Sequence, residues 1–266
     1  MELIEILGYV GAFVVGLVLG LSGGGGSIIT VPIMVYLIGI NPVTATAYSL
    51  FVVGSTSVIG TIQNFRKKLV DVKTAIIFAI PAFTVVYITR RYLVPAIPDP
   101  VFFVDESPIT KDVFIMIFFS IIMFVASLSM IRSENDSANL SFKATINIPY
   151  LVLIGIVVGL LTGIVGAGGG FLIIPALVLL AKLPMKNAIG TSLFIISINS
   201  LVGFTGDLQH RAIEWSFLLI FTAISIVGII IGVYASKFIS GTKLKRGFGW
   251  FTLVVALYII YREMFV

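Results

Sequence analysis

The sequence predicts an all-α polytopic membrane protein made of two repeats. Of its 266 residues, 59% are apolar and only 11% are charged, whereas a soluble domain of this size carries about 25% charged residues. Charge is also missing in long runs, and no Asp, Glu, Lys or Arg lies between Glu5 and Arg66. Because a hydrocarbon core about 30 Å thick needs roughly 20 apolar residues per helical pass, several passes fit into these runs. A soluble fold is excluded.

The second observation is an internal repeat. When the sequence is shifted by 143 residues, 16–72 aligns with 159–215 without a gap. Apolar composition makes chance matches of Leu, Ile and Val common, but it does not align glycines and prolines. The matched glycine and proline pairs are Gly16/Gly159, Gly20/Gly163, Gly23/Gly166, Gly25/Gly168, Gly26/Gly169 and Pro32/Pro175. The chain is therefore divided into a first repeat, 1–133, a polar connector, 134–147, and a second repeat, 148–266.

Each half begins with an apolar segment that a glycine cluster interrupts. In the first half, four consecutive glycines separate 6–22 from 27–40. In the second half, a cluster at 166–170 separates 150–165 from 171–183. Consecutive glycines sample positive φ and cost helix stability, so the helix should break there. Each cluster is predicted to be the turn of a hairpin between two short half-helices.

Three fuller helices complete each half, because each of the remaining apolar runs is long enough for a membrane pass. Their predicted ranges are 43–63, 73–95 and 112–132 in the first half, and 187–207, 215–238 and 247–263 in the second. The longest polar stretch is the connector region, so no soluble domain is expected within the chain.

Basic residues indicate how the halves face, because Lys and Arg gather on the cytoplasmic side. If each glycine hairpin turns back on itself, each half crosses the membrane an odd number of times and the repeats are inverted. One side then holds 12 Lys and Arg residues and the other holds 5, whereas parallel halves would give 8 against 9. We therefore expect an inverted repeat with both termini outside and the loops 66–73 and 237–246 in the cytoplasm. Re-entrant and fully spanning hairpins give the same count, so both stay open.

Rare residue types exclude several classes of function. The chain has no cysteine, which removes disulfides, thiolate nucleophiles and Cys-bound metals. A single histidine, His210, cannot form a histidine cage, so neither a metal nor a cofactor is expected. The net charge of +5 is attributed to membrane topology and not to nucleic acid. The expected partners are the lipid bilayer and a small anionic substrate, and a homo-oligomer stays open.

The glycine turns are candidate anion sites. Inverted repeats that each contain a broken helix are typical of secondary transporters. The helix after each turn directs free N–H groups and its positive dipole end inward, which favours an anion without any charged side chain. The candidates are Gly23, Gly24, Gly25, Gly26, Gly166, Gly168, Gly169 and Gly170. The alternative, close helix packing, is preferred for glycines at four-residue spacing, which are Gly16/Gly20, Gly155/Gly159/Gly163 and Gly228/Gly232.

A helix rich in small polar residues follows each hairpin. Ser49 and Ser192 occupy the same position of the repeat, which makes them the first side-chain candidates for contact with a substrate. Thr191 precedes Ser192 and is a further candidate. Asn199 carries an amide, which is the most unfavourable of these groups in lipid, so it should face the protein interior. The alternative for each is a hydrogen bond between helices.

Charge within the predicted membrane region is scarce. Arg90 and Arg91 end the helix 73–95 and could select anions, although we favour side chains that extend to the interface. Asp207, His210 and Glu214 follow the second polar helix and are the available groups for proton coupling. Their more common role is that of solvated loop residues.

The two motifs resemble those of the TauE/SafE family of membrane permeases. They read GLVLGLSGGGGS…VP followed by ATAYS, and GLLTGIVGAGGGF…IP followed by AIGTS. The resemblance covers both halves, with Tyr48 standing where the family usually has Thr. It implies export of sulfur-containing anions such as sulfite and sulfonates. It also implies these site residues: Gly23 to Gly26, Ser49, Gly166 to Gly170, Thr191 and Ser192.

The resulting interpretation is a secondary transporter for a small sulfur-containing anion in the cell membrane, exporting by alternating access, and not an enzyme. An anion channel is the alternative, because it uses the same site. An intramembrane serine protease is the other, since Gly20 to Gly23 read G-x-S-G around Ser22, with His210 as the available base. No G-x-x-x-x-G-K-[ST] motif is present, which argues against direct use of ATP.

Overall fold

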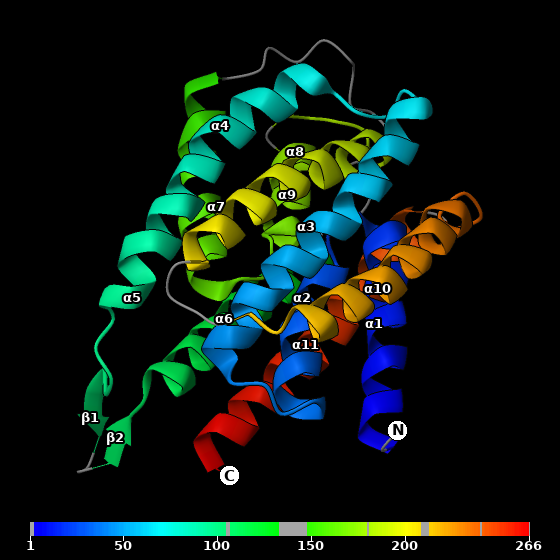
Figure 1. Cartoon of the computed structure of the whole chain (residues 1–266). Coiled ribbons are helices and arrows are strands. Elements are labelled where there is room, and N and C mark those ends of the chain that lie inside the picture. Colours follow the sequence, from blue (N-terminus) through cyan, green and yellow to red (C-terminus); the bar gives the residue numbers. More distant parts are fainter. Residues whose placement is uncertain are drawn as a thin grey trace.

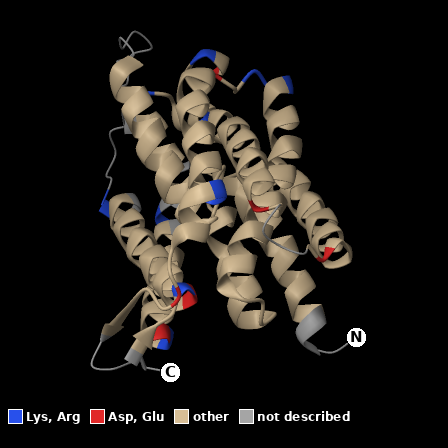
Figure 2. Cartoon of the chain, turned by 60° about the vertical axis from the view of Figure 1, so that its left-hand side comes forward, with Lys and Arg blue, Asp and Glu red and all other residues tan. Residues whose placement is uncertain are grey.

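The computed structural model describes residues 3–104, 107–132, 148–179, 181–208, 213–239 and 241–265, and it is a bundle of helices (Figure 1). Within these residues six helices are long and apolar enough to cross a membrane: Pro42–Arg66, Val72–Ala96, Lys111–Ser129, Ile148–Val165, Met185–Asp207 and Trp215–Ala235. The prediction of a polytopic α-helical membrane protein is confirmed. Charged residues are sparse in the tan body of the bundle in Figure 2.

The first half opens with a helical hairpin. Helix α1 (Leu3–Ser22) ends at the glycine cluster, and α2 (Gly26–Pro32) follows and continues into a π-helical segment, η1 (Ile33–Leu37). A Cβ added at Gly11 would lie 2.9 Å from Ile33, and one added at Gly8 would lie 3.2 Å from Ile38. The returning segment therefore runs back along α1, and the predicted break at the glycines is confirmed.

The second half opens in the same way, with α7 (Ile148–Val165) and α8 (Gly170–Leu179) on the two sides of its glycine cluster. The helix before the turn is longer than a half-helix, because α7 is itself apolar and long enough to cross a membrane. Only the segment after the turn is short, since ten residues of α-helix extend about 15 Å. The prediction of two short half-helices is wrong for α7, and it is equally wrong for α1, which has 20 residues.

The remaining elements follow the predicted ranges closely. In the first half they are α3 (Pro42–Arg66), α4 (Val72–Ile88), the π-helical η2 (Thr89–Leu93), α5 (Val94–Ala96), β1 (Phe102–Val104), β2 (Ser107–Ile109) and α6 (Lys111–Arg132). In the second half they are α9 (Met185–Asp207), α10 (Trp215–Ala235) and α11 (Gly241–Phe265). The antiparallel pair β1 and β2 was not predicted, because three residues per strand leave no alternation to read. The connector 134–147 lies outside the described residues.

The two halves pack on each other in a reciprocal way. Helix α1 packs on α10, and its repeat counterpart α7 packs on α4, the counterpart of α10. The counterparts α3 and α9 pack on each other, and so do α6 and α11. Each half therefore supplies the partner surface that the other half needs.

Helices α3 and α9 run antiparallel. Phe51 near the beginning of α3 contacts Phe204 near the end of α9, with ring centroids 5.0 Å apart. At the opposite end, Phe65 contacts Phe194. Antiparallel counterparts are what an inverted repeat would produce; the orientation of the halves in a bilayer stays a prediction.

The spaced glycines let helix backbones touch. A Cβ at Gly16 would collide with the carbonyl oxygen of Ser225, and one at Gly228 would collide with that of Phe13. At the counterpart crossing of α7 with α4, a Cβ at Gly159 would lie 2.5 Å from the carbonyl oxygen of Ala82. The packing interpretation of these glycines is confirmed.

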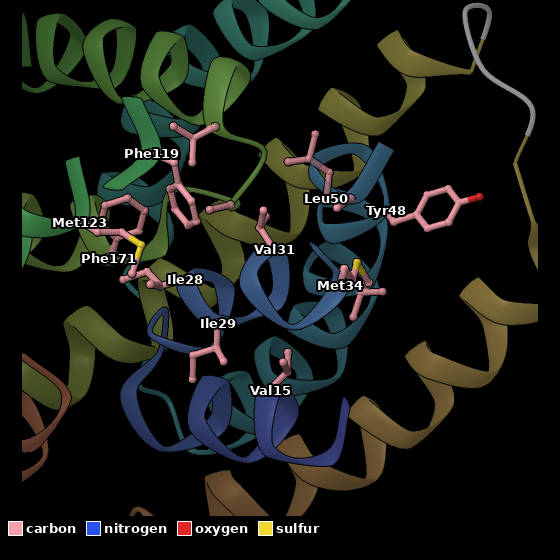
Figure 3. Packing of buried hydrophobic residues seen from close by; sticks show 14 of the residues in the cluster. Val15, Ile28, Ile29, Val31, Met34, Tyr48, Leu50, Phe119, Met123 and Phe171 are labelled. Carbon is pink, nitrogen blue, oxygen red and sulfur yellow. The ribbon is translucent and has the colours of Figure 1, made fainter. Parts of the chain in front are cut away.

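The buried segment α2 lies at the centre of the core. Every residue from Gly26 to Pro32 is buried, and Ile28, Ile29 and Val31 pack among side chains from several helices (Figure 3). A backbone break at this depth is tolerated because surrounding protein covers it. The fold thus places the first glycine turn inside the molecule.

One end of the bundle brings two basic loops together. Lys67, which follows α3, donates to the carbonyl oxygen of Val233 across 3.3 Å. Burial and the nearby charge of Lys237 lower the pKa of Lys67. The segments 66–73 and 237–246, which the sequence assigns to one side of the membrane, are therefore neighbours at this point.

Candidate functional site

The two glycine turns meet in the middle of the bundle. A Cβ added at Gly24 would lie 2.5 Å from the carbonyl oxygen of Gly170, and one added at Gly170 would collide with the Cα of Gly24. The turns need glycine for a second reason, because φ is positive at Gly23, Gly166 and Gly168. The contact joins the beginning of α8 to the turn of the other half.

Each turn also rests on the polar helix of the opposite half. A Cβ at Gly23 would lie 2.8 Å from the Cα of Ile189 on α9, and one at Gly166 would collide with Thr46 on α3. Ile189 and Thr46 occupy the same repeat position. The two turns therefore have equivalent surroundings that differ in chemistry, and the second turn is the more polar.

The two serines at the same repeat position, Ser49 and Ser192, have different hydrogen bonds. Ser192 donates to the carbonyl oxygen of Gly23 across 2.6 Å and so ties α9 to the first turn. Its counterpart Ser49 is fully buried, and its hydroxyl has no hydrogen-bond partner among the described residues. A buried hydroxyl without a partner is costly and calls for a ligand or water. Ser49 therefore stays a candidate for substrate contact.

Two counterpart hydroxyls hold the beginnings of α4 and α10. Thr191 Oγ1 accepts a hydrogen bond from the Asp71 backbone N–H, 2.9 Å away. Its counterpart Tyr48 accepts one from the Glu214 N–H with its phenolic oxygen, 2.7 Å away, and its ring extends away from the neighbouring core residues in Figure 3. The longer tyrosine thus does at one site what threonine does at the other.

Removing either hydroxyl should destabilise the protein, because an N–H near a helix start would lose its acceptor. We expect Tyr48→Phe and Thr191→Val each to cost about 1 kcal/mol, which corresponds to about 2–4 °C in the unfolding midpoint. Thermal unfolding in detergent measures the effect. Tyr92→Phe is the matched control, since Tyr92 is 63% exposed. Equal midpoints for Tyr48→Phe and Tyr92→Phe would contradict the capping role.

A buried polar cluster lies at the middle of α3 and α9, and Asn199 is its one member among the predicted site residues. Asn199 is fully buried, and neither amide atom has a partner within the described part of the chain. The same holds for the hydroxyls of its counterpart Thr56 and of the counterparts Ser57 and Ser200. Ser57 and Ser200 occupy the same repeat position, and that serine is identical in both halves.

This cluster reaches the second glycine turn. A Cβ at Gly168 would lie 2.8 Å from Ser200 Oγ, and one at Gly169 would collide with Thr162 Oγ1. The Thr162 hydroxyl also has no partner in the described ranges. Gly166, Gly168 and Gly169 all have positive φ, a conformation that glycine adopts most readily. The second turn therefore places side-chain hydroxyls beside glycines that the backbone requires.

Arg90 does not extend to the interface. Its side chain is fully buried, Nη1 donates to Thr46 Oγ1 across 3.1 Å, and the same atom lies 3.5 Å from Asp207 Oδ2. A Cβ at Gly166 would collide with Arg90 Nη2. The prediction of an interfacial side chain is wrong for Arg90, because the long side chain turns inward to an acidic partner. Arg91 is partly exposed and lies over Tyr92.

Asp207 is likewise not a solvated loop residue, since it is the last residue of α9 and 2% exposed. Glu214 is exposed at the beginning of α10. His210 lies outside the described residues. Among the residues that the structure does describe, no group of three or more acidic or histidine side chains could hold a metal ion.

Ser22, the serine of the G-x-S-G sequence, supports the first turn. Its hydroxyl donates to the carbonyl oxygen of Val18 across 2.7 Å and accepts from the Gly25 N–H across 2.8 Å. Ser27 in the same way donates to the carbonyl oxygen of Gly24. These hydroxyls satisfy backbone groups where the helix is interrupted.

Paired helical hairpins that are interrupted by glycine turns and buried against a polar helix pair are typical of membrane transporters, and relatives carry that name. A probable membrane transporter protein of Xylella fastidiosa (strain 9a5c) is 29% identical over 254 residues, 94% of this chain and 92% of that protein. The probable membrane transporter protein YunE of Bacillus subtilis (strain 168) is 27% identical over 231 residues, 78% and 82% of the two chains.

The family follows from a match over nearly the whole chain. The model of the family described as Sulfite exporter TauE/SafE matches residues 9–259. The chain belongs to this family, as the motif resemblance predicted. No solved structure matches it.

Proposed function

We propose that this transporter moves a small sulfur-containing oxyanion, such as sulfite or a sulfonate, out of the cell by alternating access. The observation that carries the proposal is the contact between the two glycine turns, where Gly24 meets Gly170 beside the polar pair α3 and α9. In transporters with inverted repeats, interrupted helices near the midplane form the substrate site. The sulfur chemistry comes from the family description.

The second turn is the better binding surface of the two. The hydroxyls of Ser200 and Thr162 lie beside Gly168 and Gly169, just before the beginning of α8, whose first backbone N–H groups are the proposed donors to the anion. The further candidates Ser49 and Asn199 lie on the two polar helices and are fully buried. Together these groups replace water around an anion without requiring a metal. Gly23 to Gly26 complete the site from the opposite half, while Thr191 and Ser192 fix its walls.

Export needs no dedicated proton pathway. A monoanion that leaves a cell with 100 mV of internal negative potential gains about 2.3 kcal/mol, which supports roughly fiftyfold accumulation outside. This driving force is consistent with the scarcity of carboxylates in the helices. The charge that the substrate carries outward therefore suffices as the energy source.

The test is thermal stabilisation of the detergent-purified protein by a panel of anions, followed by flux in proteoliposomes. A ligand at a hundred times its dissociation constant adds about 2.7 kcal/mol of stability. We expect sulfite or a sulfonate to stabilise the protein more than acetate and chloride, and external substrate to accelerate efflux. Stabilisation by none of these anions would overturn the proposal, and ion conductance without substrate exchange would favour a channel.

A further inference from the structure

We propose that Asp207 competes with the substrate for Arg90. Its carboxylate pairs with Arg90 while no substrate is bound, and the transported oxyanion replaces it. This inference rests on the proposed function, because it assigns a charged group to the same second glycine turn. It makes Arg90 the residue that recognises an oxyanion, and Asp207 a competitor for that residue.

The position of Arg90 is the first observation. Its guanidinium lies against Gly166, where an added Cβ would collide with Nη2, while Nη1 faces Thr46 and Asp207. The arginine is fully buried and the aspartate is 2% exposed. A full positive charge therefore stands at the turn that carries three glycines of positive φ.

The repeat supplies an internal comparison. Shifting by 143 residues places Val233 opposite Arg90, Asn64 opposite Asp207 and Ile189 opposite Thr46. At the counterpart turn, the three atoms nearest to a Cβ on Gly23 all belong to Ile189. Asn64 forms a hydrogen bond within its own helix, because its amide donates to the carbonyl oxygen of Gly60 across 2.8 Å. The three positions that carry Arg90, Asp207 and Thr46 at the second turn thus carry neutral residues at the first turn.

This comparison argues that the ion pair is not needed to hold the fold. Removing two charges from water costs several kcal/mol per ion, and apolar replacements of a buried pair are often neutral or stabilising. The counterpart place at the first glycine turn carries such neutral residues in the same chain. Only one of the two repeat-related places carries the ion pair. We therefore assign the pair a role in function and not in folding.

Arginine chemistry sets the class of ligand. Its planar fork binds two oxygen atoms of a carboxylate, phosphate or related oxyanion, which a spherical halide cannot match. A buried arginine also needs a negative partner at all times, because an unpaired buried charge is strongly destabilising. The substrate can therefore bind Arg90 only when the Asp207 carboxylate moves away from it.

The backbone around Arg90 is irregular, whereas the backbone around its repeat counterpart is regular. Arg90 lies in the π-helical segment η2, Thr89–Leu93, whereas the counterpart Val233 lies in the regular α-helix α10. Single π turns inside helices are frequent at functional sites. The side chain that meets Gly166 therefore comes from an irregular segment of the helix.

The experiment compares wild type with Asp207→Asn and with the double variant Arg90→Val/Asp207→Asn, which copies the residues of the counterpart place. The matched control is Asn64→Ala. Each protein is purified in a chloride buffer that contains no oxyanion, and titrations with sulfite and with additional chloride are followed by thermal unfolding. Removing the competitor should lower the apparent Kd for sulfite about tenfold in Asp207→Asn, because more of the protein is then competent to bind.

We expect the double variant to fold but to lose selective stabilisation by sulfite, and Asn64→Ala to keep the wild-type Kd within about twofold. Because Asp207→Asn leaves a buried arginine without its partner, it is also extracted in the presence of sulfite, which should restore folding. Wild type stabilised by sulfite but Asp207→Asn binding no tighter, or not rescued, would overturn the inference. So would unchanged sulfite binding in the double variant. Wild type stabilised by no anion would instead count against the proposed function.

Discussion

Replacing Gly168 with valine is expected to abolish sulfite flux in proteoliposomes while the protein still inserts into the membrane. Its φ of +66° disfavours a β-branched side chain by about 1–3 kcal/mol. The added Cβ would lie 2.8 Å from Ser200 Oγ and 2.9 Å from Val53 Cγ1, so the walls of the site must move. Flux is measured per protein recovered in the membrane fraction, which separates lost transport from lost expression.

The matched control is Gly39→Val, because Gly39 has a similar φ of +82° but no atom within 4 Å of an added Cβ. It carries the backbone strain without the steric conflict, and we expect it to retain most of the flux. If both variants transported equally well, Gly168 would have no part in the site. If both were inactive, strain in the backbone and not the position would explain the loss.

The largest loss of stability is expected from Gly228→Val, at the crossing of α10 with α1. Its added Cβ would collide with the carbonyl oxygen of Phe13 and lie 2.8 Å from the Leu17 nitrogen. Main-chain atoms cannot rotate away, so the helices must separate. We expect a loss of about 3 kcal/mol or more, which lowers the unfolding midpoint by about 10 °C. Gly159→Val, at the counterpart crossing, should behave similarly.

Gly247→Val is the control for this prediction. Gly247 lies in α11 with no atom within 4 Å of an added Cβ, so the substitution changes only the backbone preference. We expect its midpoint in detergent to stay near that of the wild type. A wild-type midpoint for Gly228→Val would show that α1 and α10 are not in direct backbone contact in the membrane protein.

The repeat made most of the fold predictable. Glycine positions identified the helix breaks, because glycine is the residue that a tight turn and a close crossing both require. The length of α7 was misjudged, since the glycine cluster marks where a helix ends but not how far back it extends. The short pair β1 and β2 carried no periodic signal.

The candidate site was harder to predict because it depends on partners far apart in the chain. Arg90 ends an apolar helix, where an interfacial side chain is the usual outcome. Only the packing of α9 against η2 brings Asp207 to it. Comparing the halves residue by residue would have flagged Arg90, since its counterpart is Val233. The same comparison hid the shared role of Tyr48 and Thr191, whose side chains look unrelated.

The pairing of α1 with α10 also affects the order of biosynthesis. Helix α1 leaves the ribosome first, but α10 begins only at Trp215. At about 5–20 residues per second, this separation lasts roughly 10–40 s. During that time the glycine face of α1 lacks its partner α10, and the first turn lacks its hydrogen bond from Ser192 until α9 has been made. A chain truncated between the halves would therefore leave the glycine face of α1 uncovered.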